Sequence, residues 1–321
     1  MSLILGCGVR RGIFKNQYED IGIAKRLGFR AVQIMTGDPT RVNKGKDIMS
    51  EDLAKKIGRE YKDMKIFIHA GFLFNIGRSL DKNKFFAKIV LDDLKLASLC
   101  GAVGVVVHVA RFSRKWGVVD PDVICSNITK QIVYILRKIP SSWGARLIVE
   151  TGSDFKTEYP LQLEKLAECA FKNVMRSAQG RKEKEHFLEH LGFCIDTAHI
   201  YNAGYDVGDP LIMKGTLDLV DELFGENLVL VHFNDTSRKL REGGRDVHCA
   251  ILEGGALTVG SIKVICGWAK ERGVPLVLES HDKSKDREMH KREKGRIEMI
   301  CVLGKDSVGK LVKCRSCYVV Q

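Results

Sequence analysis

The stretch Val103-Gly-Val-Val-Val-His108 is a short, almost wholly apolar run that ends in a histidine. A run of this kind is typical of a parallel strand that is covered on both faces. Seven further runs of similar character occupy residues 3–7, 31–35, 65–69, 146–150, 192–196, 228–232 and 275–279. The sequence therefore predicts eight parallel strands.

Segments with helical periodicity lie between these runs. Apolar residues recur every three or four positions over residues 86–97 and again over residues 124–139. Eight strand–helix units in 321 residues predict an α/β fold, a closed (β/α)8 TIM barrel in a single domain. We expect the barrel to span residues 1–304 and residues 305–321 to form a tail that contains Cys314 and Cys317. No Gly-x-Gly-x-x-Gly follows the first strand, which argues against dinucleotide binding.

Two charged segments stand outside this alternation. Arg181–His190 is expected to lengthen the fifth helix or to form a surface loop, and the eighth helix is expected after residue 282. The basic run at residues 283–296 also contains acidic residues, so we interpret it as a solvated helix face. The four histidines outside the motifs described below are expected on the polar surface; they are His186, His190, His281 and His290.

Charge and cysteine content limit the class of protein. Lys and Arg total 52 against 40 Asp and Glu, and this net charge of +12 favours a polyanionic partner, although it also serves solubility. The ten cysteines are too sparse for a disulfide scaffold. Neither a signal peptide nor a transmembrane stretch is recognisable, so we expect a soluble intracellular protein of the cytoplasm or nucleus.

Six of the eight predicted strands end in a polar residue. These residues are His69, His108, Glu150, Asp196, His232 and Glu279. The carboxyl ends of all barrel strands open onto one face, where barrel enzymes build their active sites. A carboxylate or an imidazole buried there is costly unless it binds a metal or a partner. We therefore predict that these six side chains converge on one site.

Two short pairs extend this set of candidate ligands. His199 follows Asp196 by three residues, and the i, i+2 spacing of Asp246 and His248 places both on one side of an extended segment. The nine candidates are five imidazoles and four carboxylates, a mixture that suits zinc or manganese better than calcium or magnesium. Nine ligands exceed the needs of one tetrahedral ion, so we predict a cluster of two or three metals, which suits phosphoester hydrolysis.

Seven motifs carry a likeness to a known family. They are His69-Ala-Gly-Phe-Leu-Phe-Asn75, Gly101-Ala-Val-Gly-Val-Val-Val-His108, Leu147-Ile-Val-Glu150, Cys194-Ile-Asp-Thr-Ala-His-Ile-Tyr-Asn-Ala-Gly-Tyr-Asp206, His232-Phe-Asn-Asp-Thr236, Arg245-Asp-Val-His248 and Pro275-Leu-Val-Leu-Glu279. In order and spacing they resemble the endonuclease IV family (AP endonuclease family 2), of which the chain looks like a divergent member. The segment from Cys194 to Asp206 is the most specific part of this resemblance.

The resemblance implies a DNA repair enzyme with three zinc ions, manganese being possible instead. His69, His108 and Glu150 would hold one ion, and Glu150 would join Asp196, His232 and Glu279 on the second. His199, Asp246 and His248 would hold the third. The enzyme would hydrolyse the phosphodiester 5′ to an abasic site, leaving a 3′-hydroxyl and a 5′-deoxyribose phosphate, and would trim blocked 3′ ends. A hydroxide bound to the zinc cluster would be the nucleophile, with Glu150 and Glu279 as the catalytic residues nearest to it.

The resemblance also implies where DNA is contacted. Phe72 and Leu73 fill positions that wedge into the base stack when a nucleotide is extruded. Arg41 is a candidate for a minor-groove contact, and Asn75, in the same loop motif as the wedge, is a further candidate for a DNA contact. The expected partner is damaged double-stranded DNA, bound by a monomer without a nucleotide cofactor or a membrane.

Two other functions are compatible with a metal-binding barrel. A sugar isomerase or epimerase of the xylose isomerase-like superfamily shares the scaffold, but its two-metal site is normally dominated by carboxylates. A non-catalytic DNA-binding barrel would be favoured if a bridging ligand were missing, and none is missing here.

Cys314 and Cys317 are interpreted as an incidental pair in the tail. The alternatives are half of a zinc site or a disulfide.

Overall fold

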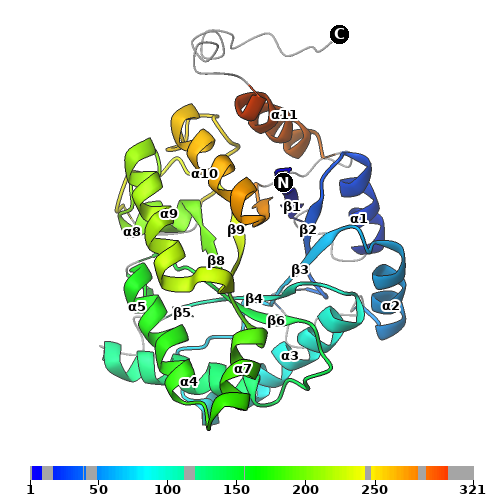
Figure 1. Ribbon diagram of the computed structural model, residues 1–321, viewed down its shortest axis with the longest axis vertical. Helices are drawn as coiled ribbons and strands as arrows, with labels where there is room; N and C mark the ends of the chain where they lie inside the picture. Colours follow the sequence, from blue (N-terminus) through cyan, green and yellow to red (C-terminus); the bar gives the residue numbers. More distant parts are fainter. Residues whose placement is uncertain are drawn as a thin grey trace.

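The strands form a closed parallel barrel in the computed structural model, which describes residues 2–8, 17–38, 40, 49–111, 120–154, 156–242, 247–280 and 287–302. Around the barrel the strand order is β1-β10-β9-β8-β6-β4-β3-β2 (Figure 1). The strands are β1 (Leu5–Gly8), β2 (Ala31–Ile34), β3 (Lys65–His69), β4 (Gly104–His108), β6 (Arg146–Glu150), β8 (Leu191–Asp196), β9 (Leu228–His232) and β10 (Leu276–Leu278). The predicted TIM barrel is confirmed.

The helices surround the strands as an outer ring (Figure 1). They are α1 (Gln17–Arg26), α2 (Glu51–Glu60), α3 (Leu80–Leu99), α4 (Pro121–Leu136), α5 (Leu163–Ala167), η2 (Glu168–Lys172), α6 (Asn173–Arg176), α7 (Arg181–His190), α8 (Thr197–Ala203), α9 (Pro210–Phe224), η3 (Gly225–Asn227), α10 (Val259–Arg272) and α11 (Glu288–Val302). Several begin at a capping side chain that accepts backbone N–H bonds, among them Ser50, Asp120 and Asp209.

Inside the barrel, one residue from each of seven strands forms an apolar layer. These residues are Ala31, Phe67, Val106, Ile148, Cys194, Leu230 and Val277. Side chains alternate between the two faces of a strand, so the residue two positions further on also points inward. Those residues are Gln33, His69, His108, Glu150, Asp196, His232 and Glu279. The barrel interior is therefore apolar in one layer and polar in the layer directly above it, at the carboxyl end of the strands.

The segments outside the barrel pattern are now assigned. Arg181–His190 is a separate helix, α7, and the predicted last helix is α11. A small antiparallel pair, β5 (Ala110–Arg111) with β7 (Glu158–Tyr159), was not predicted, because each strand has only two residues. Within the described segments no helix is long and apolar enough to cross a membrane. Residues 305–321, including Cys314 and Cys317, lie outside the described residues.

Expectations about four side chains were wrong, among them Glu293 of the basic run, which is 1% exposed. His190 and His290 are both 1% exposed instead of lying on the surface, because their ring nitrogens bond to backbone oxygens of neighbouring segments. Arg287 in the basic run is also fully buried, since its guanidinium bonds to Gly8 O and faces Asp20. Of the other two histidines expected on the surface, His186 is half-buried and His281 lies outside the described residues.

One disulfide is present among the described cysteines, between Cys125 on α4 and Cys169 on η2. Its Cα atoms are 4.9 Å apart and its two residues are separated by 44 positions in the sequence. It joins the helical segments that precede and follow β6, the strand that ends in Glu150. A single cross-link of this kind is not a disulfide scaffold, but no pattern in the sequence indicated it.

Candidate metal centre

The polar layer of the barrel brings eight of the nine predicted ligands together. They form three groups of side chains whose ligand atoms lie within 4.8 Å of one another: His69, His108 and Glu150; Glu150, Asp196, His232 and Glu279; and Asp196, His199 and His248. The ninth predicted ligand, Asp246, lies outside the described residues. Since Glu150 and Asp196 each belong to two groups, the three groups form one continuous cluster.

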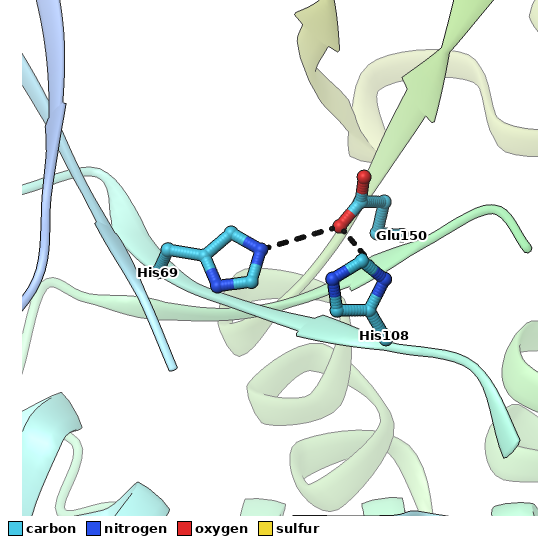
Figure 2. A group of neighbouring side chains, drawn as sticks. All are labelled: His69, His108 and Glu150. Atoms are coloured by element: carbon cyan, nitrogen blue, oxygen red, sulfur yellow. Dashed lines mark ion pairs between the residues drawn. The ribbon is translucent and has the colours of Figure 1, made fainter. Parts of the chain in front are cut away.

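The first group is centred on one oxygen of Glu150. His69 Nε2 and His108 Nδ1 lie 3.5 and 3.4 Å from Glu150 Oε2, and Figure 2 shows both rings turned toward this same oxygen. Neither Glu150 Oε2 nor His108 Nδ1 has a hydrogen-bond partner among the described residues, although both atoms are buried. Buried polar atoms normally have partners. A metal ion bound by the three side chains would satisfy both atoms, so the residues fit such an ion.

The second group meets at His232, which is completely buried at the end of β9. Its Nδ1 lies 2.8 Å from Glu150 Oε1, 3.2 Å from Glu279 Oε2 and 3.9 Å from Asp196 Oδ2. The strand register sets this arrangement, because Asp196 pairs directly with His232 and Glu150 pairs with His108. One nitrogen and three carboxylates are thus directed at one position.

The third group is built around the start of α8. Asp196 is the N-cap of this helix, and its Oδ1 accepts hydrogen bonds from Ala198 N and His199 N at 2.7 and 3.1 Å. Its other oxygen, Oδ2, faces His199 Nε2 at 3.8 Å and His248 Nε2 at 3.6 Å. The cap therefore explains the spacing of Asp196 and His199, since the first helical turn places both side chains on one side.

Hydrogen bonds outside the cluster decide which ring nitrogens face it. His69 Nδ1 lies 2.8 Å from Ala70 O, and His199 Nδ1 lies 2.8 Å from Thr151 O. A carbonyl oxygen only accepts, so each Nδ1 carries a proton, and Nε2 is the nitrogen whose lone pair is available to a metal when the ring is neutral. Such a bond from the second nitrogen is the usual way in which a metal-binding histidine is oriented.

Gln33 is a site residue that the sequence did not reveal. It is 4% exposed on β2, and its Oε1 lies 2.8 Å from His232 Nε2 while its Nε2 donates to Glu279 Oε1 at 2.5 Å. It therefore leaves Nδ1 of His232 as the ligand atom and holds one oxygen of Glu279. A glutamine is not a typical zinc ligand, but its position two residues after inward-facing Ala31 was a usable signal.

Asn234 is a second residue that the motifs did not single out. It is 2% exposed, and its Nδ2 donates to Asp196 Oδ2 at 2.6 Å and to Glu279 Oε2 at 3.0 Å. Its Oδ1 accepts from Glu279 N at 2.9 Å. The amide therefore fixes the relative positions of two predicted ligands on different strands.

The electrostatics of the cluster keep its acids ionised. Burial opposes ionisation of Glu150, but the adjacent His108 and His232 rings hold its pKa well below the usual value. Burial likewise opposes ionisation of Glu279, and His232 lowers the pKa of this carboxyl overall. Burial lowers the pKa of His108. Burial acts in the same direction on His69 and His232, but Glu150 beside His69, and Cys194, Glu279 and Glu150 beside His232, raise the pKa values of these two rings overall. Because these side chains bind a metal as anionic carboxylates and neutral imidazoles, metal binding would compete with protons at His69 and His232.

The predicted DNA-contact residues lie beside the cluster. Phe72 and Leu73 are 49% and 36% exposed, and the Phe72 ring lies 5.8 Å from that of His69. With His108 and Arg111 they line a cavity of about 240 Å³. An exposed apolar pair at this place is what a wedge requires.

Asn75 occupies a different environment from that of its loop neighbours. It is only 8% exposed, its Nδ2 donates to Arg111 O, and its Oδ1 accepts from Arg111 N at 3.2 Å and from Gly77 N at 3.0 Å. Its amide therefore joins the Phe72 loop to β5, and a DNA contact by Asn75 remains a prediction. Arg41 lies outside the described residues.

The fold and the cluster together define a TIM barrel with histidine and carboxylate side chains gathered at its carboxyl end. The chain belongs to the xylose isomerase-like TIM barrel family, whose model matches residues 21–265. It is 28% identical over 284 residues to a probable endonuclease 4 of Clostridium botulinum (strain Alaska E43 / Type E3), covering 87% of this chain and 92% of that protein. It is 27% identical over 268 residues to a putative endonuclease 4 of Acanthamoeba polyphaga mimivirus, covering 80% and 79% of the two proteins.

Among solved structures, endonuclease IV from Thermus thermophilus superposes with a TM-score of 0.69 at 22% identity, covering 92% of this chain and 99% of that chain. At this identity the structural likeness supports the fold alone. The relatives and the family model confirm the resemblance that the seven sequence motifs indicated.

Proposed function

We propose that this protein is a zinc-dependent AP endonuclease that hydrolyses the phosphodiester 5′ to an abasic site in double-stranded DNA. The observation that carries the proposal is the shared carboxylate: Glu150 directs Oε2 at His69 and His108, and Oε1 at His232. A carboxylate shared in this way is suited to bridging two ions, and clusters of ions are typical of phosphodiester hydrolases. The endonuclease 4 relatives support the same activity.

The ligand assignment in this proposal follows the first two groups of side chains, and in the third it assigns Asp246 as a ligand in place of Asp196. His69, His108 and Glu150 would hold one ion; Glu150, Asp196, His232 and Glu279 would hold a second; His199 and His248, with Asp246, would hold a third. When bound, zinc supplies Lewis acidity toward the phosphate and lowers the pKa of a coordinated water. Glu150 and Glu279 are the catalytic residues in this proposal: Glu150 is shared by the first two groups, and Glu279 belongs to the second.

The chain's own residues also account for substrate binding in this proposal. The net charge of +12 attracts the DNA backbone, and Phe72 and Leu73 enter the base stack beside the cluster. An extruded abasic nucleotide then reaches the polar layer without a base to accommodate. The enzyme acts as a monomer, and the same site trims blocked 3′ ends, since both reactions cleave a phosphoester beside a 3′-oxygen.

The direct test uses a duplex that carries a tetrahydrofuran abasic analogue. The zinc-loaded protein is expected to cut this duplex on the 5′ side of the lesion and to leave an undamaged duplex intact. Glu279→Gln replaces a charged ligand with a neutral side chain of nearly the same size and is expected to abolish cleavage. If the lesion duplex stays intact and the protein isomerises a sugar substrate, the nuclease proposal fails and the protein is a sugar isomerase. Metal analysis giving one ion per chain would contradict the cluster.

A further inference from the structure

One face of α11 is bonded to two loops that carry predicted metal ligands. The face consists of His290, Glu293 and Arg296, which follow one another at intervals of three residues. Figure 1 shows α11 beside α10, outside the barrel. None of the three side chains belongs to the proposed cluster, so their contacts serve another purpose.

The contacts of this face converge on Ser280 and Ile251. Glu293 accepts a hydrogen bond from Ser280 Oγ through Oε2 and from Ile251 N at 3.0 Å through Oε1. His290 Nε2 lies 3.0 Å from Ser280 O, and Arg296 Nη1 donates to Ile251 O at 2.9 Å. Each loop therefore has two hydrogen bonds to α11. One is made by a donor of the loop, Ser280 Oγ or Ile251 N, and the other by a backbone carbonyl, Ser280 O or Ile251 O.

The two contacted residues are close in sequence to predicted ligands of different groups. Ser280 directly follows Glu279, which belongs to the second group, and Ile251 lies three residues after His248, which belongs to the third. Glu293 bonds to both loops through its own carboxyl group. Its two oxygens thus connect the backbone of one loop, at Ile251 N, with a side chain of the other, at Ser280 Oγ.

We propose that Glu293 is a positioning residue of the metal centre, which holds the loop carrying His248 in register with the strand end carrying Glu279. This inference rests on the proposed metal cluster and assigns Glu293 no contact with substrate or metal. A histidine and a carboxylate on separate loops bind neighbouring ions well only if both loops are fixed, and residues that orient ligands change metal affinity about 10- to 100-fold.

The environment of Glu293 indicates how the contact works. The side chain is 1% exposed, and burial raises its pKa to about 7. Glu253 and Cys249 approach it from the loop side, and Arg296 and His290 are its charged or titratable neighbours on α11. The neutral carboxyl can accept from Ile251 N and donate to Ser280 Oγ, so both bonds are possible in either ionisation state.

This hydrogen-bond pattern defines an informative pair of variants. Glu293→Gln retains an acceptor for Ile251 N and offers a donor to Ser280 Oγ, so it preserves both connections. Glu293→Leu has a similar volume but leaves the Ile251 N–H and the Ser280 hydroxyl without their acceptor. Glu298→Leu is the matched control, because Glu298 is on the same helix but is exposed and pairs only with Lys294 among the interactions described here.

The test is zinc binding by the full chain, measured by metal analysis and by titration against a competing chelator, with thermal unfolding of the metal-free protein recorded in parallel. Glu293→Leu is expected to weaken zinc binding at part of the cluster by at least about tenfold. Glu293→Gln and Glu298→Leu are expected to titrate like the parent protein. If Glu293→Leu unfolds, Ser280→Ala removes one of the two bonds with a smaller change and is expected to show the same partial loss.

The outcomes separate this inference from the proposed function. Zinc titrations of Glu293→Leu, or of Ser280→Ala where the former does not fold, that match the parent protein would overturn the positioning role, even if the melting temperature falls. A parent protein that binds several zinc ions but does not cut the lesion duplex would overturn the nuclease proposal. The zinc titrations of the variants would then still decide whether Glu293 has the positioning role. A parent protein that binds no zinc would overturn both.

Discussion

Glu150 Oε1 lies 2.8 Å from His232 Nδ1, in the interior of the barrel where both residues are buried. The second oxygen of the same carboxylate faces His69 and His108 instead. Two ligand groups therefore depend on one side chain, whereas every other described ligand except Asp196 belongs to a single group. Removing the charge of Glu150 affects two proposed ions at once.

Glu150→Gln is expected to lose at least one zinc ion per chain and to lower the rate of lesion cleavage about 1,000-fold. A metal contributes several kcal/mol to stabilising the transition state, and each 1.36 kcal/mol corresponds to a factor of ten in rate. Metal analysis and single-turnover cleavage are the two measurements. Glu271→Gln on the exposed part of α10 is the control; a Glu150→Gln protein with full zinc and full activity would contradict the shared-ligand role.

Gln33→Leu tests the orientation of His232 from the opposite side. The variant removes the acceptor for His232 Nε2 and the donor to Glu279 Oε1 without removing any ligand. We expect zinc affinity to fall about 10- to 100-fold, as is usual when an outer partner of a ligand is lost. A chelator titration measures this change, and excess zinc should restore most of the cleavage activity. Unchanged affinity would mean that packing alone orients His232.

Phe72→Ala combined with Leu73→Ala tests the DNA wedge. Both side chains are partly exposed and neither is a predicted ligand, so the double variant should keep its zinc content and melting temperature. Stacking of an aromatic side chain on a base is worth about 1–3 kcal/mol, so binding of the lesion duplex should weaken roughly 10- to 100-fold. Phe85→Ala is a suitable control, because Phe85 is 58% exposed but lies on α3. Equal binding by the double variant and the control would exclude the wedge.

The disulfide between Cys125 and Cys169 should stabilise the fold without affecting the site. A cross-link that closes a loop of this length reduces the entropy of the unfolded chain, which is typically worth about 2–4 kcal/mol. Cys125→Ser with Cys169→Ser is therefore expected to lower the urea midpoint, and reductant should do the same to the parent protein only. Identical midpoints with and without reductant would show that the bond does not form in solution.

Glu293 should make stability depend on pH in a defined direction. Its pKa of about 7 in the folded protein is raised above the ordinary value of 4.5. Its contribution to the free energy of unfolding is therefore complete below pH 4.5 and is lost as the pH rises through 7. Glu293→Gln stays neutral, so its free energy of unfolding should rise by up to about 3 kcal/mol relative to that of the parent as the pH increases from 4.5 to 7. Urea unfolding of the metal-free proteins at several pH values measures the difference; a constant difference would contradict the raised pKa.

The sequence was sufficient to predict the barrel and most of its site, because both depend on local patterns. Apolar runs ending in His, Asp or Glu located the strands, since a buried polar strand end has few explanations besides ligand binding. Gln33 and Glu293 were missed for different physical reasons. A lone glutamine has no characteristic metal chemistry, and Glu293 lies in a charged run whose burial depends on how α11 packs.

Features that depend on distant segments could not be predicted. Cys125 and Cys169 are 44 residues apart, and nothing in their spacing indicates that α4 and η2 bring them together. The burial of Arg287 likewise requires contact with Gly8 and Asp20 at the other end of the chain. The period-two pattern within a strand, by contrast, is fixed by the backbone itself.

That pattern restricts how the gene can change length. The apolar layer and the polar layer are two residues apart on each of seven strands, so deleting one residue from β6 before Glu150 would turn its carboxylate away from the barrel interior. Single-residue insertions and deletions within these strands should therefore be eliminated by selection. Length variation among relatives is expected to accumulate in the connecting loops, or within strands only in pairs of residues.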